Sequence, residues 1–305
     1  MKVANYPAWS EAAPLPTLRG GCAGAVIDGR LYVLGGGLSA KRPVDTVESY
    51  DPVTNQWKPH RPMPLPRNNV VAAVLDGKIY VVAGLVAPAG STDEQPLENE
   101  PSDRVDVYDP QTDTWTTCAP LPEARVKPGL SVVNGRLYAL GGRHGDVNTT
   151  SIVSYDPAVD AWNKVADLPL GVRHAPAAQA GGLIYLTGGW SPNGDKGDIH
   201  AKVWRFDPAS NEVEEVASMP EPRVAHSLIE VDGQLLALGG VTADKSFLES
   251  VCLYDPTIDS WTALDFEMDP RGIFAAGLID RHIHVAGGWT KLYKEPHTTV
   301  QTHSL

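Results

Sequence analysis

Cysteine is scarce in this sequence of 305 residues, and its three copies lie far apart. Cys22, Cys118 and Cys252 form no Cys-x-x-Cys pair, and an odd number of distant thiols builds neither a disulfide framework nor a zinc ribbon. We therefore expect buried free thiols, no bound metal and no other cofactor.

Basic residues are few as well. The chain has 25 lysine and arginine residues against 37 aspartate and glutamate residues, which gives a formal net charge of -12. A protein that holds nucleic acid through phosphate contacts needs the opposite balance. Nucleic acid is therefore not expected as a partner.

Long apolar runs are missing. No segment reaches the length needed to span a membrane, and Met1 to Trp9 contain no apolar stretch of signal-peptide length. This pattern predicts a soluble, cytoplasmic protein that makes no contact with a membrane. We also expect it to be a monomer.

Aromatic residues make up only 7% of the chain, whereas 29 glycines and 26 prolines are spread evenly along it. This content is high but remains below the range typical of disordered chains. It indicates frequent turns in an ordered, all-β protein.

A repeat of about fifty residues organises the chain. Pairs of small residues follow apolar runs six times, and the intervals between their first members are 48, 58, 47, 51 and 48 residues. The six pairs are Gly35-Gly36, Ala83-Gly84, Gly141-Gly142, Gly188-Gly189, Gly239-Gly240 and Gly287-Gly288.

Five of the repeats also have an aromatic residue before Asp-Pro, and four of these five have a tryptophan seven residues after that aromatic, as in Tyr50 and Trp57. From the tryptophan position to the next glycine pair the count is 26 residues in all six repeats. Nearly all variation in length therefore falls between the glycine pair and the next aromatic residue. Insertions are tolerated in that one connection.

Four antiparallel strands per repeat follow from the local pattern. Runs such as Leu31–Leu34 indicate buried strands, and Asp28-Gly29 before that run suits a two-residue hairpin turn. Six such sheets are stable when they pack radially, which predicts a six-bladed β-propeller. We expect the glycine pairs to let neighbouring aromatic rings lie against the backbone.

The ends of the chain complement one another. Trp9 has no repeat before it, and the last repeat has no tryptophan strand of its own. The N-terminal segment should therefore close the last blade. We predict a single propeller over residues 1–305, with blades near 18–60, 66–118, 125–165, 173–217 and 223–264 and a sixth blade made of 272–303 with 5–11.

Glycine pair, Tyr-Asp-Pro, tryptophan, and then Met-Pro or Leu-Pro before arginine, as in Met63-Pro64 to Arg67, resemble the kelch repeat over essentially the whole chain. The departures are local: Ala83, Phe206, Val213 and His284. The resemblance implies an adaptor or scaffold role, and in many animal members a neighbouring domain recruits a ubiquitin ligase. This sequence has no room for such a domain, so an adaptor would need a separate partner, unless the sequence is a fragment.

An arginine recurs ten residues after the tryptophan position in five of the six repeats. These arginines could form a ring of cations for carboxylates or phosphates. Because they repeat in register, we favour a structural role in which each holds its connection through backbone carbonyls. The set is Arg19, Arg67, Arg125, Arg223 and Arg271, with Val172 in the fourth repeat.

Residues that differ between repeats at exposed positions are better candidates for function. Two such positions lie two residues beyond the arginine and directly after the glycine pair, on the face that collects the variable connections. Together with their neighbours they predict a cationic and aromatic rim, the mixture common in binding hot spots. The predicted binding residues are Asn69, Lys127, Arg143, His144, Arg173, His174, Trp190 and Trp289.

No catalytic constellation is found, since nucleophile-elbow and phosphate-loop motifs are absent. We predict a binding protein that holds a protein or peptide on the variable-loop face, with a small acidic ligand at the channel mouth as a further option. The alternative is an enzyme of the sialic-acid epimerase or mutarotase type. In that case His174 would act as acid or base and Trp190 as a sugar platform.

Overall fold

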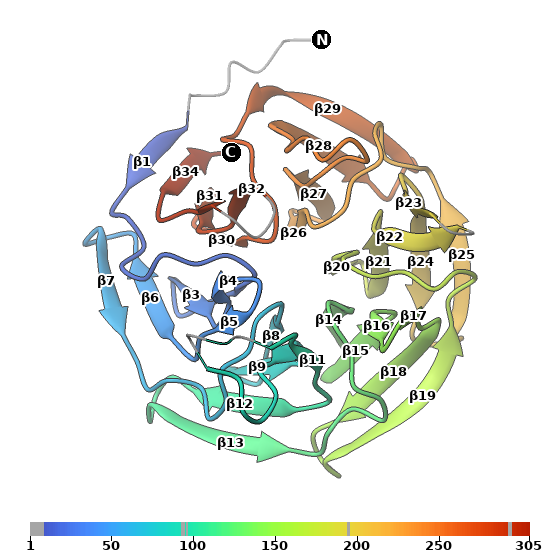
Figure 1. Ribbon diagram of the computed structural model, residues 1–305. Helices are drawn as coiled ribbons and strands as arrows, with labels where there is room; N and C mark the ends of the chain where they lie inside the picture. Colours follow the sequence, from blue (N-terminus) through green and yellow to red (C-terminus); the bar gives the residue numbers. More distant parts are fainter. Residues whose placement is uncertain (1–8, 93–94, 96, 194–195, 292–294) are drawn as a thin grey trace.

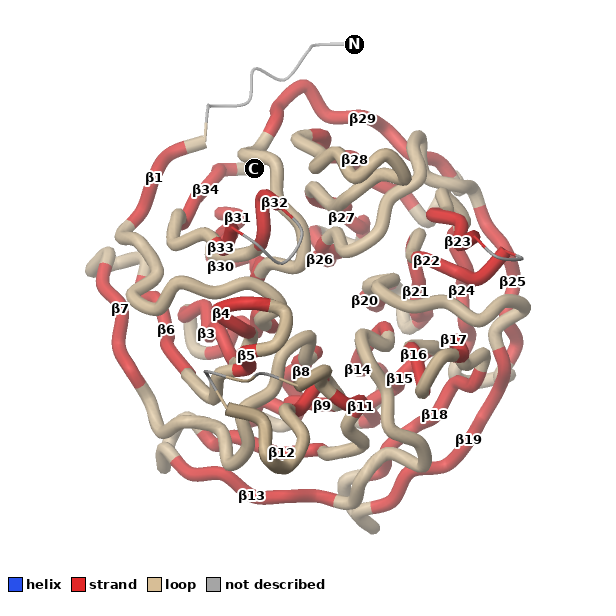
Figure 2. The backbone as a smooth tube through the Cα atoms, viewed as in Figure 1, coloured by secondary structure: helices blue, strands red, loops and turns tan. Residues whose placement is uncertain are grey.

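A computed structural model describes residues 9–92, 95, 97–193, 196–291 and 295–305. Six four-stranded antiparallel sheets surround a central axis (Figure 1). Strands joined by turns and loops make up the described residues, and no helix occurs among them (Figure 2). The predicted all-β, six-bladed propeller is confirmed.

Within each blade the four strands lie side by side. We label them a, b, c and d in order from the innermost strand, next to the axis, to the outermost strand at the rim. In that order, blade 1 is β2 (Ala23–Ile27), β3 (Arg30–Leu34), β6 (Val47–Asp51) and β7 (Gln56–Pro59); blade 2 is β8 (Val71–Leu75), β9 (Lys78–Val82), β12 (Val105–Asp109) and β13 (Thr114–Cys118); blade 3 is β14 (Gly129–Val133), β15 (Arg136–Leu140), β18 (Ser151–Asp156) and β19 (Ala161–Asp167).

The second half of the ring repeats this order. Blade 4 is β20 (Ala177–Ala180), β21 (Leu183–Thr187), β24 (Val203–Asp207) and β25 (Glu212–Val216); blade 5 is β26 (Ser227–Val231), β27 (Gln234–Leu238), β28 (Ser250–Asp255) and β29 (Ser260–Glu267); blade 6 is β30 (Ala275–Ile279), β31 (His282–Ala286), β34 (Val300–Ser304) and β1 (Ser10–Ala12).

The N-terminal strand closes the ring, as predicted. β1 pairs antiparallel with β34, with Ser10 opposite Thr302 and Ala12 opposite Val300. Figure 1 shows this blue strand completing a red blade. Residues 5–8 of the predicted closing segment lie outside the described residues.

Five of the b–c connections form small two-stranded sheets on the face that also holds the d–a connections. They are β4 (Gly37–Ser39) with β5 (Arg42–Pro43), β10 (Leu85–Val86) with β11 (Glu100–Pro101), β16 (Arg143–His144) with β17 (Val147–Asn148), β22 (Trp190–Asn193) with β23 (Lys196–Ile199), and β32 (Trp289–Lys291) with β33 (Glu295–Pro296). We call this side the loop face.

The glycine pairs serve the backbone and not aromatic packing. Gly35 and Gly36 have φ values of +57° and +103°, and a Cβ on Gly35 would lie 2.8 Å from the carbonyl oxygen of Arg67. The Gly36 N–H donates to that same carbonyl at 2.9 Å. Equivalent bonds join every blade to the next one: Gly84 to Arg125, Gly142 to Val172, Gly189 to Arg223, Gly240 to Arg271 and Gly288 to Arg19.

A second set of contacts, which we call the rim latch, joins the outer strands of neighbouring blades. Asp160 Oδ1 accepts hydrogen bonds from the Ala119 N–H at 2.8 Å and from the Tyr155 hydroxyl at 2.7 Å, while the Trp162 indole donates to the Ala119 carbonyl at 3.1 Å. The same arrangement is centred on Asn55, Asp113 and Asp259.

The rim latch explains why the aromatic residue and the tryptophan recur seven residues apart. In this registry the tyrosine hydroxyl donates to the aspartate oxygen that accepts the N–H of one residue in the preceding blade, and the indole donates to the carbonyl of that same residue. Blade 4 has Phe206 and Val213 at these positions, so it supplies neither donor.

Replacing Asp160 by alanine should lower the free energy of unfolding at neutral pH by about 1–3 kcal/mol, because two hydrogen bonds to a carboxylate are lost. Asp160→Asn should stay close to wild type, since Asn55 performs the same task in blade 1. Unfolding in denaturant measures the free energy of unfolding of both variants. Equal stability of the alanine and wild-type proteins would contradict the latch.

The dependence of stability on pH should differ between wild type and the Asp160→Asn variant in acid. Hydrogen bonds from Ala119 and Tyr155 lower the pKa of Asp160 below its ordinary value of 3.8. The stabilisation is therefore present above that pH and is lost as the pH falls through the lowered pKa. Asp160→Asn should lack this part of the acid dependence.

Candidate functional site

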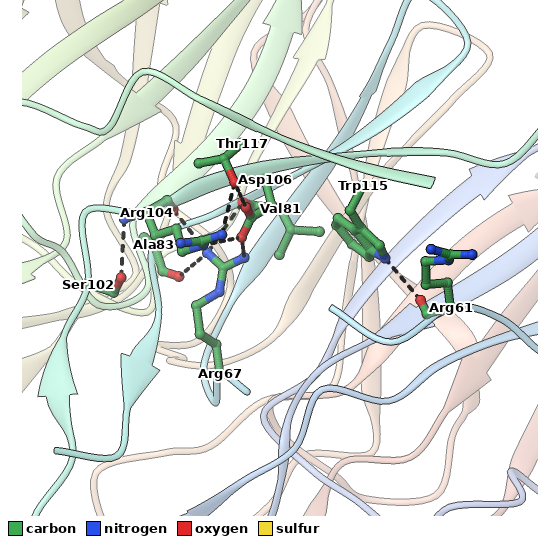
Figure 3. A network of polar contacts seen from close by, with 9 residues as sticks. All are labelled: Arg61, Arg67, Val81, Ala83, Ser102, Arg104, Asp106, Trp115 and Thr117. Atoms are coloured by element: carbon green, nitrogen blue, oxygen red, sulfur yellow. Dashed lines mark hydrogen bonds and ion pairs between the residues drawn. The ribbon is translucent and has the colours of Figure 1, made fainter. Parts of the chain in front are cut away.

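The five repeated arginines are fully buried. Figure 3 shows Arg67, which donates to the carbonyls of Ala83 at 3.2 Å and Arg104 at 3.0 Å and to Asp106 Oδ2 at 2.7 Å. These acceptors belong to strands b and c, or to their ends, in the blade that Arg67 precedes. The guanidinium thus points into its own blade.

The other members of the set do the same. Arg125, Arg223 and Arg271 donate to the carbonyls of Gly141, Gly239 and Gly287 at 3.1, 3.1 and 3.2 Å, and Arg19 donates to the Val33 carbonyl at 3.0 Å and to Glu48. A cationic ring at the channel mouth is therefore not formed by these side chains.

Blade 4 replaces the arginine by an apolar pair. Val172 takes the arginine position, and Trp204 takes the position that Glu48 and Asp106 occupy in blades 1 and 2. Val172 and Trp204 are both buried and belong to one apolar cluster. An apolar pair of suitable volume is a common substitute for a buried ion pair.

The residue two positions beyond each arginine adopts a left-handed backbone in all six blades. The φ values run from +47° at Lys127 to +69° at Gly21. This conformation turns the N–H groups along the ring, so that each of five residues donates to the carbonyl of its counterpart in the preceding blade. The bonds are Gly21 to Ile273, Asn69 to Gly21, His174 to Lys127, Ala225 to His174 and Ile273 to Ala225.

This backbone ring, which we call the channel collar, decides where three predicted residues lie. Asn69 is 2% exposed and therefore offers almost no surface to a ligand. Lys127 and His174 are partly buried and line a cavity of about 160 Å³ inside the channel. His226, which the sequence analysis did not single out, lines the same cavity.

Burial lowers the pKa of His174 well below 6.5, with smaller contributions from Lys127, Arg173 and Arg143. Burial also lowers the pKa of His226 well below that value, and it lowers the pKa of Lys127 to about 8. At neutral pH the channel therefore contains two neutral imidazoles beside one ammonium group.

Arg173 and Trp190 are brought together by strand-like pairing of two loops. In every blade the residue after the arginine position pairs with the residue after the glycine pair, and in blade 4 these two residues are Arg173 and Trp190. Their backbones exchange hydrogen bonds at 3.0 and 2.9 Å, and the guanidinium carbon lies 3.9 Å from the indole ring centroid. This is a cation–π contact.

A pocket of about 310 Å³ extends from this stack to the loops of blade 5. Gly197 permits the arrangement, because a Cβ there would lie 1.8 Å from the indole ring. Among the described residues that line the pocket, Arg173 and Lys245 are basic and none is acidic. The lining consists of Arg173, His174, Trp190, Gly197, Ile199, Val224, Ala225, Val241, Thr242, Ala243, Lys245 and Ile273.

The remaining predicted residues lie apart from this pocket. Arg143 is partly exposed, and His144 is exposed and contacts the Ala124 carbonyl at 2.9 Å through its ring Nδ1. Trp289 was predicted at the exposed rim, but it is 0% exposed. It covers Gly20 of blade 1, where a Cβ would lie 2.4 Å from the indole ring, so it is part of the core.

Two other expected features concern cysteine and membranes. All three cysteines are free; Cys22 and Cys252 are buried and Cys118 is partly buried. In the described part of the chain we find no helix with the length and apolarity required to cross a bilayer.

The fold and the repeated buried arginines define a β-propeller whose six blades share one arrangement of four strands. Residues 5–169 match the family model of the KLHDC2/KLHL20/DRC7 Kelch-repeats domain, and residues 172–220 match the Kelch motif. The chain belongs to the kelch-repeat family.

Several proteins show this relationship along the sequence. Kelch-like protein 26 of Danio rerio is 28% identical over 60% of this chain and 30% of its own length. Kelch-like protein terF of Aspergillus terreus is 28% identical over 76% of this chain and 52% of its own length. The chain thus spans between about a third and a half of these two relatives.

A solved structure shows the same fold over nearly the whole chain. The structure of YjhT superimposes with a TM-score of 0.80, and the match covers 96% of this chain and 97% of that one at 17% sequence identity. At that identity the likeness establishes the architecture alone.

Replacing Arg67 by alanine should lower the free energy of unfolding by about 3 kcal/mol, the lower end for a broken buried ion pair. The loss is moderated because Arg104 Nε still contacts Asp106 at 2.7 Å. Arg61→Ala is the matched control: its side chain is exposed, and only its backbone N–H and carbonyl take part in a latch. A drop of less than 1 kcal/mol for Arg67→Ala would contradict a structural role.

Proposed function

We propose that this propeller is a protein-interaction module that binds an extended segment of a partner protein on the loop face. The pocket between blades 4 and 5 would receive an acidic residue together with a neighbouring apolar residue of that segment. The Arg173–Trp190 stack is the observation on which this proposal rests.

The chemistry of the pocket supports this assignment. Arg173 has a planar guanidinium that suits a carboxylate, and Lys245 is a second basic residue in the pocket lining. Trp190, Ile199 and Val224 supply apolar surface beside these charges. Arginine and tryptophan together are typical of residues that dominate binding energy at protein interfaces.

The protein's overall charge supports the preference of this pocket for an acidic segment. The chain carries a formal net charge of -12, so a cationic pocket stands out against an acidic surface. An acidic segment would be repelled by most of the molecule and attracted at this place, which favours a defined register of binding.

The relatives are consistent with this class of function. One of them is named Kelch repeat and BTB domain-containing protein 1, from camelpox virus, and it is 27% identical over 55% of this chain. Its name records a kelch repeat together with a BTB domain. We extend the adaptor role to this chain as part of the proposal.

The test is selection from a random peptide library displayed on phage. Wild type should enrich peptides in which an acidic residue adjoins an apolar one. Arg173→Ala combined with Trp190→Ala should weaken their binding by 30-fold or more, corresponding to about 2 kcal/mol. Arg136→Ala, an exposed arginine on the turn face opposite the loop face, is the control and should bind like wild type.

Gly197→Ala probes the pocket without removing a side chain. The added methyl group overlaps the indole position, so Trp190 must move away from Arg173. We expect weaker peptide binding with little change in melting temperature. Equal binding by wild type and the double variant would overturn the assignment of this pocket.

A further inference from the structure

The channel cavity contains a cation that has no acidic neighbour. Lys127 Nζ donates to the Val70 carbonyl at 3.1 Å. Among the described residues that line the cavity, none is an aspartate or a glutamate. A buried ammonium group is costly unless its charge and its protons are matched. It carries three N–H donors, so one bond to a carbonyl leaves two for a ligand.

Two histidines add further polar atoms to the same cavity. His226 is 6% exposed, its Nε2 lies 2.8 Å from the Thr187 hydroxyl, and its Nδ1 is buried without a hydrogen-bond partner among the described protein atoms. His174 Nδ1 is buried in the same way. When the Thr187 hydroxyl donates to Nε2, the ring proton of His226 resides on Nδ1, which makes that atom a donor.

These groups come from three consecutive blades and line one cavity: Lys127 and His174 belong to the channel collar, and His226 follows the collar residue of blade 5. The left-handed residues Lys127 and His174 place their side chains toward the cavity, and His226 begins the inner strand region of blade 5. The residues that correspond to His226 in the other blades are Cys22, Val70, Pro128, Ala175 and Phe274, and those that correspond to Lys127 and His174 are Gly21, Asn69, Ala225 and Ile273. One half of the channel wall is therefore polar and the other half is largely apolar.

We propose that the channel binds a small oxyanion, of the size of acetate or selenate, between Lys127, His174 and His226. The cavity of about 160 Å³ has room for such a group and its remaining water. The ammonium supplies the charge, and the imidazole N–H groups supply oriented neutral donors. The site shares His174 with the pocket between blades 4 and 5, but Arg173 and Trp190 do not line the cavity, so the inference does not depend on the proposed function.

The first experiment measures the melting temperature as sodium acetate is added at constant ionic strength. Wild type should show a saturable rise that fits a single site. Lys127→Met should show no rise above its own baseline. Methionine, like lysine, is unbranched at Cβ, so the substitution leaves the requirement for a left-handed backbone at this position unchanged. Lys78→Met, at an exposed lysine on the opposite turn face, should respond like wild type.

A second variant guards against misfolding of the first. His226→Phe places in blade 5 the residue that blade 6 has at this position, Phe274, and should weaken acetate binding several-fold while the protein stays folded. A rise in melting temperature that is equally large in Lys127→Met, or the lack of any saturable rise in wild type, would overturn the proposal.

The pH dependence gives an independent readout. The titratable groups that face Lys127 are Cys22 and His174; burial raises the pKa of the Cys22 thiol above 9.0, and His174 is already neutral at pH 7. Acetate affinity should be constant from pH 7 to about 8 and fall by up to tenfold per unit above it, as Lys127 in the free protein loses its proton. A flat profile to pH 9 would contradict the site.

Crystals soaked in selenate locate the anion directly. The anomalous signal of selenium should appear in the channel within hydrogen-bond distance of Lys127 Nζ in wild type and should be absent in Lys127→Met. Signal confined to the outer surface would argue against the channel site.

Discussion

The buried arginine at the start of five of the six blades stabilises its own blade and also the contact with the neighbouring one. Its guanidinium holds strands b and c of its own blade, and its backbone carbonyl accepts the N–H of the glycine pair from the preceding blade. A change at this residue therefore affects both the blade and its contact with the neighbour. The backbone bonds between neighbouring blades run around the whole ring, because the Gly288 N–H of blade 6 donates to the Arg19 carbonyl of blade 1.

Burial of five guanidinium groups is compatible with a stable fold only because each one has several acceptors at fixed positions. The rim latch adds a second belt of contacts at the outer strands, where one backbone residue is held by both a carboxylate and an indole. The two belts lie at opposite ends of each sheet. Between them, apolar side chains of neighbouring blades fill the core.

Blade 4 departs from both belts, and the candidate binding pocket lies beside it. Val172 and Trp204 replace the charged core, and Phe206 and Val213 cannot form the latch. The arginine of this blade stands one residue later, so that Arg173 pairs with Trp190 on the loop face instead of entering the sheet. A shift of one residue thus moves a cation from the structural set to the surface.

The propeller could be predicted from the sequence because every spacing that matters is local. The interval of 26 residues from the tryptophan position to the glycine pair covers strands d, a and b, and it does not vary. The same local reasoning placed Arg173 outside the structural set. It misjudged the glycine pairs, since the group that needs their space is a carbonyl from the next blade and not an aromatic ring of the same repeat.

The candidate site shows where local reasoning ends. Trp289 and Trp190 occupy the same place in their repeats, yet one is buried over Gly20 of the next blade and the other stacks on Arg173 beside a pocket. Lys127 and His174 were predicted together at an exposed rim, whereas both line the channel cavity; His226 was not singled out, because it lies about fifty residues from His174 and shares a cavity with it only when the ring closes.

Sequence alone determined the number of blades, their strand order and the closure by the N-terminal strand, because hydrogen-bonded hairpins depend on neighbouring residues. Tertiary structure decided which of the variable side chains are exposed and which share a cavity. Exposure and proximity depend on the loops of adjacent blades, and those loops approach one another only after all six sheets have packed around the axis.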